Sequence, residues 1–591
     1  MHLYLWHYDI TLWQEKTKNL YIDCNRLFSR GERGMATEAE TDEEEVKEAE
    51  EVKEAEEEVK EAEKAKGELG TKKIEATRHL MESIKDTVEK SLLEKIEEKE
   101  VDVVPEALVI GGGIAGMYAA LDIADAGFKV HLVERLPSIG GHMAQLDKTF
   151  PTLDCSACIL TPRLVDVGVN PNINLMSCSE VIGVEGSVGN FKVKVRKNAK
   201  YVDETICTGC MMCEEACRLK GRFPNEFDLG LMKRGPIYRP FPFAIPAAYS
   251  IDGKTCLMIK KGKCGKATLE STIEAVKKRE RGEEITKDEA PPCVLACGPN
   301  CIHHDMEDEI VELNVGGIIV ATGFDVMEPE CMPEYKYGVY PNVVHGLEFE
   351  RYSSASGPTM GRMQIAGMPE PKDAVFLSCV GSRNSQTGYE YCSRVCCMYL
   401  AKQAHLLQEK VPDCNITVLY QDVRAFGKGF EEFYDRVKGE GLSYRRGLAS
   451  EIYKKPGSDR VIVRAEDTML GEPYELEADL IVLGIGLKPS EGSEKLLEML
   501  GVSLTSDNFA KEAHPKLRPV DTEVEGVFVT GCAQGPKDIP DSVAQAKAAA
   551  GAILALLARG KAKIRPSVAE IDEEMCIGSN SLIEMAEKIG A

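Results

Sequence analysis

The stretch ALVIGGGIAGMYAALDIADAGFKVHLVE, residues 107–134, decides the fold of this chain. It predicts a buried strand, a glycine-rich turn, a helix and a second strand that ends in an acidic residue. Glycines in such a turn let the backbone approach a pyrophosphate, the helix N-terminus supplies N–H donors, and the terminal carboxylate meets a ribose. A glycine motif alone is weak, but this context predicts a dinucleotide-binding domain with contacts from Gly111, Gly113, Ile114, Ala115, Gly116 and Glu134.

Two later segments favour FAD over NAD as the dinucleotide. GGIIVATGF at 316–324 is typical of the strand and turn that close an FAD domain, and GVFVTG at 526–531 resembles the strand that reaches the ribityl chain. We therefore add Gly323 and Gly531 to the expected contacts, with Gly141 from the stretch that would run beside the isoalloxazine. Cys532 stands where such flavoproteins often have an acid.

A cysteine-rich segment interrupts this domain at Cys207-Thr-Gly-Cys210-Met-Met-Cys213-Glu-Glu-Ala-Cys217. Its C-x2-C-x2-C-x3-C spacing lets three thiolates bind one cubane cluster while the fourth reaches a neighbouring cluster. A second set follows, made of Cys256, Cys264, Cys293 and Cys297. Residues 265–292 form a charged insertion between its second and third members. Because the last cysteine of each set crosses over in two-cluster ferredoxins, we expect two [4Fe-4S] clusters, one held by Cys207, Cys210, Cys213 and Cys297 and the other by Cys256, Cys264, Cys293 and Cys217. Cys301 is left over, and a zinc knuckle is the alternative, although zinc sites usually pair two C-x2-C halves.

A third group of cysteines lies where a flavoprotein of this kind would bind NAD(P)H. The strand DAVFLSCVGSR, residues 373–383, begins a second nucleotide-type domain, but it has Gly381 alone instead of a G-x-G-x-x-G turn. The cradle for a second pyrophosphate is therefore missing. Four thiolates stand in its place and could hold a further [4Fe-4S] cluster as partner of the flavin: Cys379, Cys392, Cys396 and Cys397.

Cys155 and Cys158 form a separate C-x2-C pair. Such a pair is typical of a redox dithiol, and it could also contribute to a cluster. Two small buried thiols without a function are the remaining alternative.

Composition excludes several classes of protein. The chain has 591 residues, 43% of them apolar, which predicts several domains with buried cores. It has 21 cysteines but no secretory leader, so we expect neither export nor a disulfide framework. A formal charge of −25 argues against nucleic acid as a partner. No apolar run approaches the roughly 20 residues that span a bilayer, so we expect a cytoplasmic protein without direct membrane insertion.

The N-terminal region differs from the rest of the chain. Residues 1–34 contain both tryptophans and end in Gly-Glu-Arg-Gly, which a ribosome-binding site would encode, so we expect the true start at Met35. Residues 38–64 carry fifteen acidic and four basic side chains in a degenerate repeat, which predicts a solvated helix or a disordered tether. Apolar residues at helical spacing between 72 and 98 predict an amphipathic helix that packs on the body or on a partner.

The motifs together resemble one known family. PTLDCSACILTPR, CTGCMMCEEAC, YRPFPFAIPAAYSID, SCVGSR with YCSRVCCMYLAKQA, and GPKDIPDSVAQAKAAAGAIL are similar to segments of the heterodisulfide reductase A family, over about residues 105–575. The resemblance implies an α/β flavoprotein core with two nucleotide domains, like that of thioredoxin reductase, and an inserted α+β two-cluster ferredoxin-like domain. It implies an oxidoreductase that passes electrons from a hydrogenase or formate dehydrogenase module, through FAD, to ferredoxin and to a disulfide-reducing partner subunit. It also admits a homodimer.

Parts of the chain depart from the family pattern. Longer members carry a cysteine-bearing N-terminal domain and end in a second two-cluster ferredoxin domain, whereas here Cys576 is followed by Ser579 and the chain stops at Ala591. A relay flavoprotein of a quinone-interacting complex and a cluster-bearing scaffold with a vestigial flavin therefore remain alternatives. The expected domains are an early start (1–34), an acidic extension (35–104), the FAD domain in three parts (105–200, 306–371 and 511–565), the ferredoxin-like insertion (201–305), the second nucleotide-type domain (372–510) and a ferredoxin-like remnant (566–591).

Overall fold

The computed structural model describes residues 99–387 and 389–564 of the chain. The early start, the acidic repeat and the amphipathic stretch that we expect before residue 99 lie outside the described residues, as does the ferredoxin-like remnant at 566–591. β1 (Lys99–Asp102) pairs antiparallel with β26 (Lys561–Ile564), so the first and last described segments lie side by side.

The dinucleotide motif lies in a five-stranded parallel sheet. Val109 faces one side of this sheet while Leu108 and Ile110 face the other, because side chains alternate along a strand. All three are buried, since both faces of the sheet are covered. The strands in sheet order are β25 (Val527–Val529), β14 (Gly317–Val320), β2 (Glu106–Ile110), β3 (Lys129–Val133) and β4 (Ile173–Met176).

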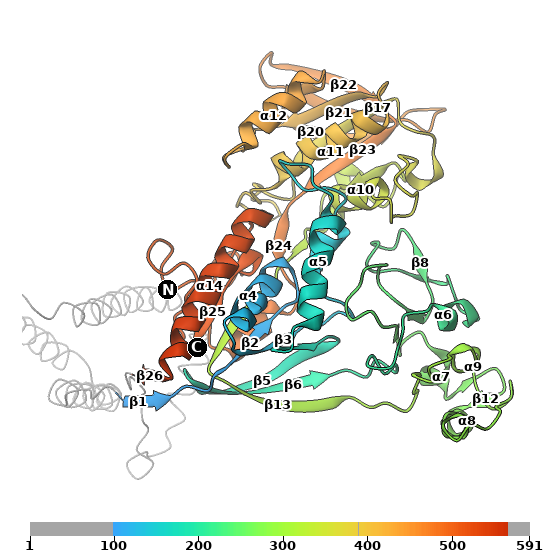
Figure 1. The fold of residues 1–591 in the computed structure, drawn as a ribbon. Helices are drawn as coiled ribbons and strands as arrows, with labels where there is room; N and C mark the ends of the chain where they lie inside the picture. Colours follow the sequence, from blue (N-terminus) through green and yellow to red (C-terminus); the bar gives the residue numbers. More distant parts are fainter. Residues whose placement is uncertain (1–98, 388, 565–591) are drawn as a thin grey trace, which may run out of the picture. The chain divides into compact units, whose positions relative to one another are not determined.

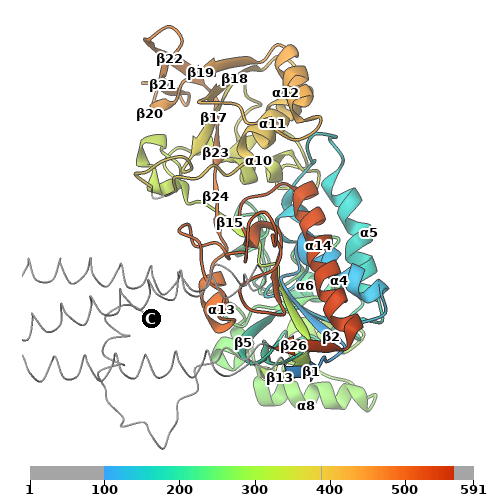
Figure 2. The same cartoon turned by 90° about the vertical axis from the view of Figure 1, so that its left-hand side faces the viewer.

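Helices cover one face of this first sheet and strands cover the other. α4 (Ile114–Asp125), α5 (Ser156–Val169) and α14 (Ile539–Arg559) pack on one face (Figures 1 and 2). The opposite face packs on α13 (Ser493–Met499) and on an antiparallel sheet of β13 (Glu309–Val315), β6 (Asn190–Lys197) and β5 (Ser179–Ser187). Among the described helices, α14 alone has the length and apolar composition of a membrane span. Its Ala546, Ala549 and Ile553 are buried in the core with α4.

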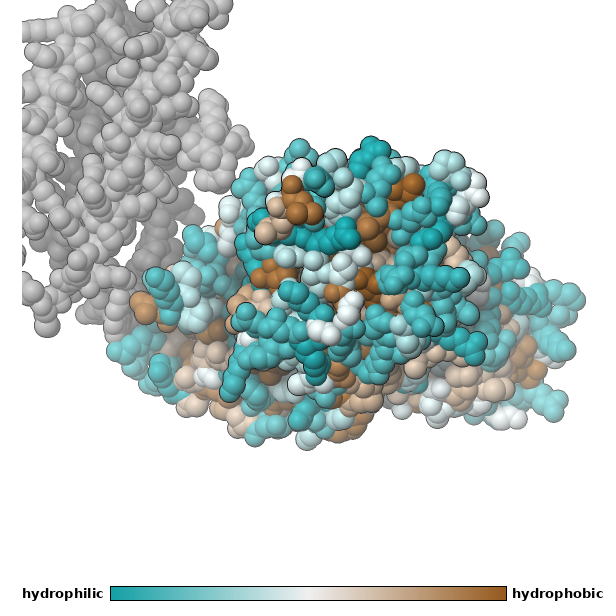
Figure 3. All heavy atoms as spheres, turned by 90° about the horizontal axis from the view of Figure 1, so that it is seen from above, coloured by the Kyte–Doolittle hydropathy of each residue, from teal (hydrophilic) through white to brown (hydrophobic). Residues whose placement is uncertain are grey.

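A second five-stranded parallel sheet has the same layered plan. Its strands in order are β16 (Val343–His345), β23 (Leu480–Ile485), β17 (Asp373–Val380), β18 (Asn415–Tyr420) and β19 (Ser443–Arg446). One face packs on α10 (Gly346–Ser353), α11 (Cys396–Lys410) and α12 (Phe430–Gly439), and the other on the antiparallel strands β20 (Ala449–Lys454), β21 (Val461–Asp467) and β22 (Glu472–Ala478). Seen from the side of β20–β22 and α12, the surface is mostly hydrophilic, with small separate hydrophobic areas (Figure 3). The expected α/β fold with two nucleotide domains is confirmed.

The two sheets are joined by a short ribbon in which β15 (Phe324–Val326) pairs antiparallel with β24 (Leu487–Pro489). The second sheet begins earlier in the chain than the expected residue 372, because β16 pairs with β23. It also ends earlier than residue 510, since α13 packs in the core of the first sheet. A strand of three residues is too short to show a hydrophobic period, which is why the sequence did not reveal β16.

The inserted segment between β6 and β13 is built from short elements around its own small core. Several cysteines stand at helix ends: Cys217 follows α6 (Met212–Ala216), Cys256 precedes α7 (Leu257–Lys261) and Cys297 follows α9 (Pro292–Ala296). The longest helix, α8 (Leu269–Glu280), lies within the charged insertion and starts with a capping box at Thr268. Two-residue strands complete the segment: β7 (Phe223–Pro224), β8 (Lys233–Arg234), β9 (Ile237–Tyr238), β10 (Ser250–Ile251), β11 (Lys263–Cys264) and β12 (Ala267–Thr268).

Candidate functional site

A cavity of about 780 Å³ opens at the carboxyl ends of β2, β3 and β14. Its wall includes Gly111 after β2, Glu134 after β3 and Ala321 after β14. Ligands of open parallel sheets bind at this edge, where the helix N-terminus of the first β–α unit also points. The volume lies within the range of cofactor sites.

The glycine turn at this edge leaves room for a ligand. A Cβ on Gly111, whose φ is +109°, would lie 2.3 Å from the Ala321 carbonyl oxygen, and one on Gly116 would lie 1.8 Å from the Gly111 oxygen. These two glycines therefore allow strand, turn and helix to pack closely. A Cβ on Gly113 would meet no protein atom within 4 Å, and Gly113 lines the cavity. The space beside Gly113 is thus a cradle that a side chain would fill.

Glu134 fixes this turn in addition to facing the cavity. Its carboxylate accepts hydrogen bonds from the Gly112 N–H at 2.7 Å and from the Leu136 N–H at 2.8 Å. Burial raises the pKa of Glu134, and these two donors oppose the shift. The sequence suggested only a ribose contact for this residue, whereas the structure also shows it bracing the turn.

The remaining predicted contacts divide between the cavity wall and the packing behind it. Ile114, Ala115, Gly141 and Gly323 line the cavity together with Gly111, Gly113 and Glu134. Gly116 and Gly531 are not among the lining residues. Gly531 donates its N–H to Gln545 Oε1 at 2.8 Å, and a Cβ on it would lie 2.9 Å from the Ala115 side chain.

Two hydroxyl groups in the wall have no hydrogen-bond partner within the described structure. Thr322 Oγ1 and Thr530 Oγ1 are both buried, and both residues line the cavity. A buried hydroxyl without a partner is costly, so these atoms are suited to a polar ligand. Together with the open cradle at Gly113, they fit a bound dinucleotide.

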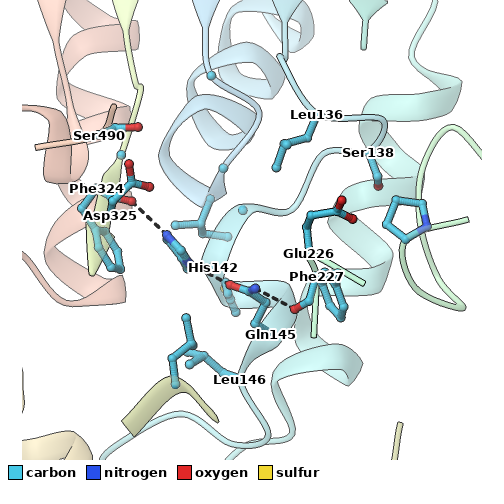
Figure 4. Close-up of a pocket in the computed structure, with 18 of the residues that line it drawn as sticks. Leu136, Ser138, His142, Gln145, Leu146, Glu226, Phe227, Phe324, Asp325 and Ser490 are labelled. Carbon is cyan, nitrogen blue, oxygen red and sulfur yellow. Dashed lines mark hydrogen bonds between the residues drawn. The ribbon is translucent and has the colours of Figure 1, made fainter. Parts of the chain in front are cut away.

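A chain of hydrogen bonds crosses the cavity (Figure 4). His142 Nε2 lies 2.9 Å from the Phe324 carbonyl oxygen and its Nδ1 lies 2.7 Å from Gln145 Oε1, while Gln145 Nε2 donates to the Phe227 carbonyl at 2.8 Å. Since Phe324 begins β15 and Phe227 belongs to the inserted segment, the chain links three parts of the protein. Sequence reasoning did not single out His142 and Gln145, although both lie in the stretch expected to run beside the isoalloxazine.

A buried positive charge lies in the wall on the side of α11. Lys402 Nζ pairs with Glu350 at 2.6 Å, and the two side chains are only 1% and 2% exposed. Lys402 also donates to the Lys148 carbonyl at 2.8 Å, and Gln403 donates to Glu350 at 2.6 Å. All four residues line the cavity. Because Glu350 compensates the charge of Lys402, this buried pair is close to neutral overall and joins α10 to α11 at the cavity wall. A lysine on a helix usually lies at the surface, so the sequence did not point to it.

The third group of cysteines adjoins the same cavity. Cys379 lies on β17, and Cys396 and Cys397 begin α11. Burial raises the pKa of Cys396 well above its usual value, and the charges of Cys397, Cys379 and Cys392 raise it further. The four sulfurs are therefore within electrostatic reach of one another. Cys396 Sγ also lies 3.6 Å from the carbonyl oxygen of Ile485, which lines the cavity.

The turn after β17 is occupied by protein contacts. The Gly381 N–H donates to Met332 Sδ at 3.1 Å, and a Cβ on Gly381 would lie 3.0 Å from Met327 Sδ. Methionine sulfur thus fills the space where a second pyrophosphate would sit in a nucleotide-binding turn.

The inserted segment brings its cysteines together in two groups. Burial raises the pKa of Cys213 to about 12, with further contributions from Cys297 and Cys207. Burial likewise raises the pKa of Cys293, with contributions from Cys256, Cys217 and Cys264. Cys297 thus lies close enough to Cys213 to affect its pKa, as Cys217 does to Cys293, and the two crossed cluster-ligand sets stay a prediction. Cys210 is exposed.

Cys301, which the sequence left over, lies against the first group. Cys297 Sγ accepts the Cys301 N–H at 3.4 Å and lies 3.4 Å from Cys301 Sγ. The hydrogen bond from the Cys301 thiol lowers the pKa of Cys297 to about 6.

Within the described residues, no three histidine, cysteine or acidic side chains are arranged to hold a single metal ion.

Comparison with known proteins gives consistent matches. A family model described as an NAD(P)-binding Rossmann-like domain matches residues 109–167. The chain is 46% identical to the A component of the H(2):CoB-CoM heterodisulfide,ferredoxin reductase of Methanothermobacter thermautotrophicus, over 86% of this chain and 73% of that protein. It is 47% identical to the second of the A-type iron-sulfur subunits of the CoB–CoM heterodisulfide reductase of Methanopyrus kandleri, with the same coverage of 86% and 73%.

The chain is also similar to a third relative and to a solved structure. The chain is 42% identical to the A component of the H(2)/formate:CoB-CoM heterodisulfide,ferredoxin reductase of Methanococcus maripaludis, over 85% of this chain and 72% of that protein. Among solved structures, the thioredoxin reductase of T. acidophilum superposes with a TM-score of 0.41 at 14% identity, covering 76% of this chain and 99% of that chain.

Proposed function

Because the chain belongs to the heterodisulfide reductase A family, we propose that it is the electron-transfer subunit that connects a flavin to iron–sulfur clusters in a heterodisulfide reductase-type complex. As a member of this family, the chain is an oxidoreductase of the heterodisulfide reductase A type. The observation that carries the finer proposal is the contact of Cys396 Sγ with Ile485 at 3.6 Å, because it sets a four-cysteine group against the wall of the dinucleotide cavity.

FAD is the dinucleotide that the cavity would hold. The residues that would bind it are Gly111, Gly113, Ile114, Ala115, Glu134, Gly141, Gly323, Thr322 and Thr530, with Gly116 and Gly531 packed behind them. When bound, FAD exchanges electron pairs with one partner and single electrons with others. His142 and Gln145 would help to orient it, and the buried Lys402–Glu350 ion pair would form part of the wall around it.

Three [4Fe-4S] clusters complete the proposed route. We assign Cys379, Cys392, Cys396 and Cys397 to the cluster beside the cavity, and the two crossed sets of the inserted segment to the other two. These thiols are buried or half-buried apart from Cys210, and iron would replace their protons because thiolates are the ligands. Since the Gly381 N–H is already bonded to Met332, we expect no NAD(P)H site in the second domain.

The partners follow from the chemistry of the relatives. The names of the relatives include hydrogen or formate, ferredoxin and the CoB–CoM heterodisulfide. We therefore infer a hydrogenase or formate dehydrogenase module as donor; the inferred acceptors are ferredoxin and a disulfide-reducing subunit. Whether electrons are split between the acceptors or relayed singly is decided by the partners, so anaerobic purification with identification of co-eluting proteins tests this part of the proposal.

A matched pair of variants tests the cluster beside the cavity. Cys396→Ser should remove about four iron atoms per chain and leave FAD bound, since the glycine turn is untouched. Cys414→Ser changes another buried cysteine of the same domain, 4% exposed, and should leave both iron and FAD unchanged. Equal iron content in the two variants would contradict the assignment, and absence of FAD from the wild-type protein would favour the scaffold alternative.

A further inference from the structure

The pair Cys155 and Cys158 lies outside the cavity and the three cysteine groups. Its two sulfurs are 2.6 Å apart, closer than two thiols that merely pack, and both residues are exposed. A disulfide bond has an S–S length of about 2.05 Å, so bond formation requires little movement of either side chain. Exposure argues against the alternative of two buried core thiols, and it leaves both sulfurs open to an incoming reactant.

The start of α5 holds the two cysteines in place. Ser156, between them, is fully buried; its N–H donates to the Asp147 carbonyl at 2.9 Å and its Oγ to the Met143 carbonyl at 2.6 Å. Cys155 forms an antiparallel bridge with Lys148, whose carbonyl accepts the bond from Lys402. The backbone on each side of the pair is therefore anchored in the body of the protein, while the sulfurs face outward.

The contacts distinguish the two sulfurs. Cys155 is the N-cap of α5, and its Sγ accepts the Cys158 N–H at 3.4 Å as well as the Cys158 thiol. Cys155 Sγ thus accepts both donors at the positive end of a 14-residue helix. Cys158, the donor, keeps its proton. The arrangement thus has one sulfur that is poised as a nucleophile and a second within reach of it.

The geometry points to a surface dithiol that reduces disulfides by thiol–disulfide exchange, with Cys155 as the attacking sulfur and Cys158 as the resolving sulfur. Cys155 thiolate attacks one sulfur of the acceptor, the acceptor S–S bond breaks, and the first leaving thiolate takes up a proton. Cys158 loses its proton and attacks Cys155 Sγ, which releases the second thiol. The acceptor disulfide gains two electrons and two protons, and Cys155 and Cys158 become a disulfide. This reaction requires none of the cofactors in the proposed function.

The test uses the full-length protein, purified anaerobically, with two probes of different size. Oxidised glutathione represents a small disulfide, and insulin represents a disulfide in a protein. We expect a Cys155–Cys158 disulfide to form with at least one probe, as read by alkylation and peptide mass spectrometry. Reaction with glutathione alone would assign small acceptors, and reaction with insulin would assign protein acceptors.

Three variants separate the roles of the two sulfurs. Cys158→Ser should trap a mixed disulfide on Cys155, whereas Cys155→Ser should trap little. Cys331 provides the control, because it is an exposed residue outside the pair. Partial desolvation of its thiol and the charge of Glu328 raise its pKa. Cys331→Ser should react as the wild type does. We expect Cys155 to be modified about tenfold faster than Cys331.

Two outcomes would overturn the inference. One is the absence of a Cys155–Cys158 disulfide with either probe at concentrations that modify Cys331. The other is a loss of iron in the double variant Cys155→Ser/Cys158→Ser with FAD retained, because that result would make the pair cluster ligands. Failure of the proposed flavin and cluster functions would leave the exchange reaction intact, so the two proposals can fail separately.

Discussion

At the scale of single residues, glycines have different roles that depend on which atoms surround them, and so do cysteines. Gly111 and Gly116 are required for packing, since a Cβ on either would overlap backbone atoms. Gly113 has space in front of it that belongs to the cavity. Cysteines differ in the same way: Cys297 Sγ accepts the Cys301 N–H and lies 3.4 Å from the Cys301 sulfur, whereas Cys414 is packed in the core.

Gly113→Ala should separate ligand binding from folding. The added methyl group meets no protein atom within 4 Å and so should not disturb the fold, but it occupies the cradle. We expect FAD affinity to fall by at least about tenfold, or 1.4 kcal/mol, as measured by flavin fluorescence on reconstitution. Gly551→Ala, in α14 with equally open surroundings, is the control and should keep full affinity. Unchanged affinity in Gly113→Ala would place the dinucleotide elsewhere.

Cys297→Ser and Cys301→Ser should differ in iron content. Cys297 is expected to be a ligand, so its loss should remove about four iron atoms per chain. Cys301 donates to Cys297 and is expected to keep iron in place while altering the environment of that sulfur. Inductively coupled plasma mass spectrometry gives the iron content of each. Equal losses in both variants would make Cys301 a ligand as well.

At the scale of elements, three of the candidate sites lie at the start of a helix. α4 begins at the glycine cradle, α5 at the exposed dithiol and α11 at the four-cysteine group. α10 begins with a capping box in which His345 Nδ1 accepts the Glu348 N–H at 3.4 Å and Glu348 accepts the His345 N–H at 2.9 Å. Burial lowers the pKa of His345 to about 3.

The cap of α10 should make this helix sensitive to acid. The unfolded pKa of histidine is about 6.5, and the folded value is lower, so stability is present above pH 6.5 and is lost as pH falls. Between pH 6.5 and 5 the loss should be about 1.6 kcal/mol, measured by hydrogen exchange of the α10 amides. His345→Asn keeps a capping oxygen without the titration and should flatten this dependence. An equally steep dependence in the variant would assign it to another group.

The sequence predicted some elements well and others not at all, for physical reasons. The β2–α4–β3 unit was predictable because its glycines, apolar strands and terminal Glu134 agree with one another. The crossed cysteine sets stay a prediction, because the crossing was expected from two-cluster ferredoxins and residues 265–292 interrupt the spacing of the second set. His142, Gln145 and Lys402 were not predictable, since each depends on partners that are distant in sequence: Phe324, Phe227 and Glu350. A contact of that kind leaves no local pattern.

At the scale of the whole molecule, buried polar links tie the inserted segment to both sheets. Arg351 Nε donates to Asp228 at 2.9 Å, and the two side chains are 2% and 5% exposed. Arg351 also donates to the Gln145 carbonyl at 3.2 Å and lies over the Phe227 ring. The link joins α10 of the second sheet, the wall of the cavity and the insertion. In the proposed function, electron transfer between these parts would depend on their fixed separation.

Asp228→Asn should loosen this link. It leaves a buried guanidinium without its counter-charge, which costs about 3–5 kcal/mol. We expect faster hydrogen exchange and earlier proteolysis of the inserted segment, measured by mass spectrometry. Glu180→Gln breaks an ion pair with Arg196 whose side chains are 47% and 43% exposed, and it should cost less than about 1 kcal/mol. Similar effects of the two changes would mean that Arg351 has an alternative partner.

The pairing of β1 with β26 has a consequence for tethering. Lys99 pairs with Ile564. The segments before residue 99 and after residue 564 are therefore attached at neighbouring backbone positions. Two modules attached at these points would share one small volume, and a short linker would give each a millimolar effective concentration for the other. A weak affinity between them would then be enough for association. A donor and an acceptor dye placed at residues 99 and 564 would report unzipping of this strand pair directly as a loss of energy transfer.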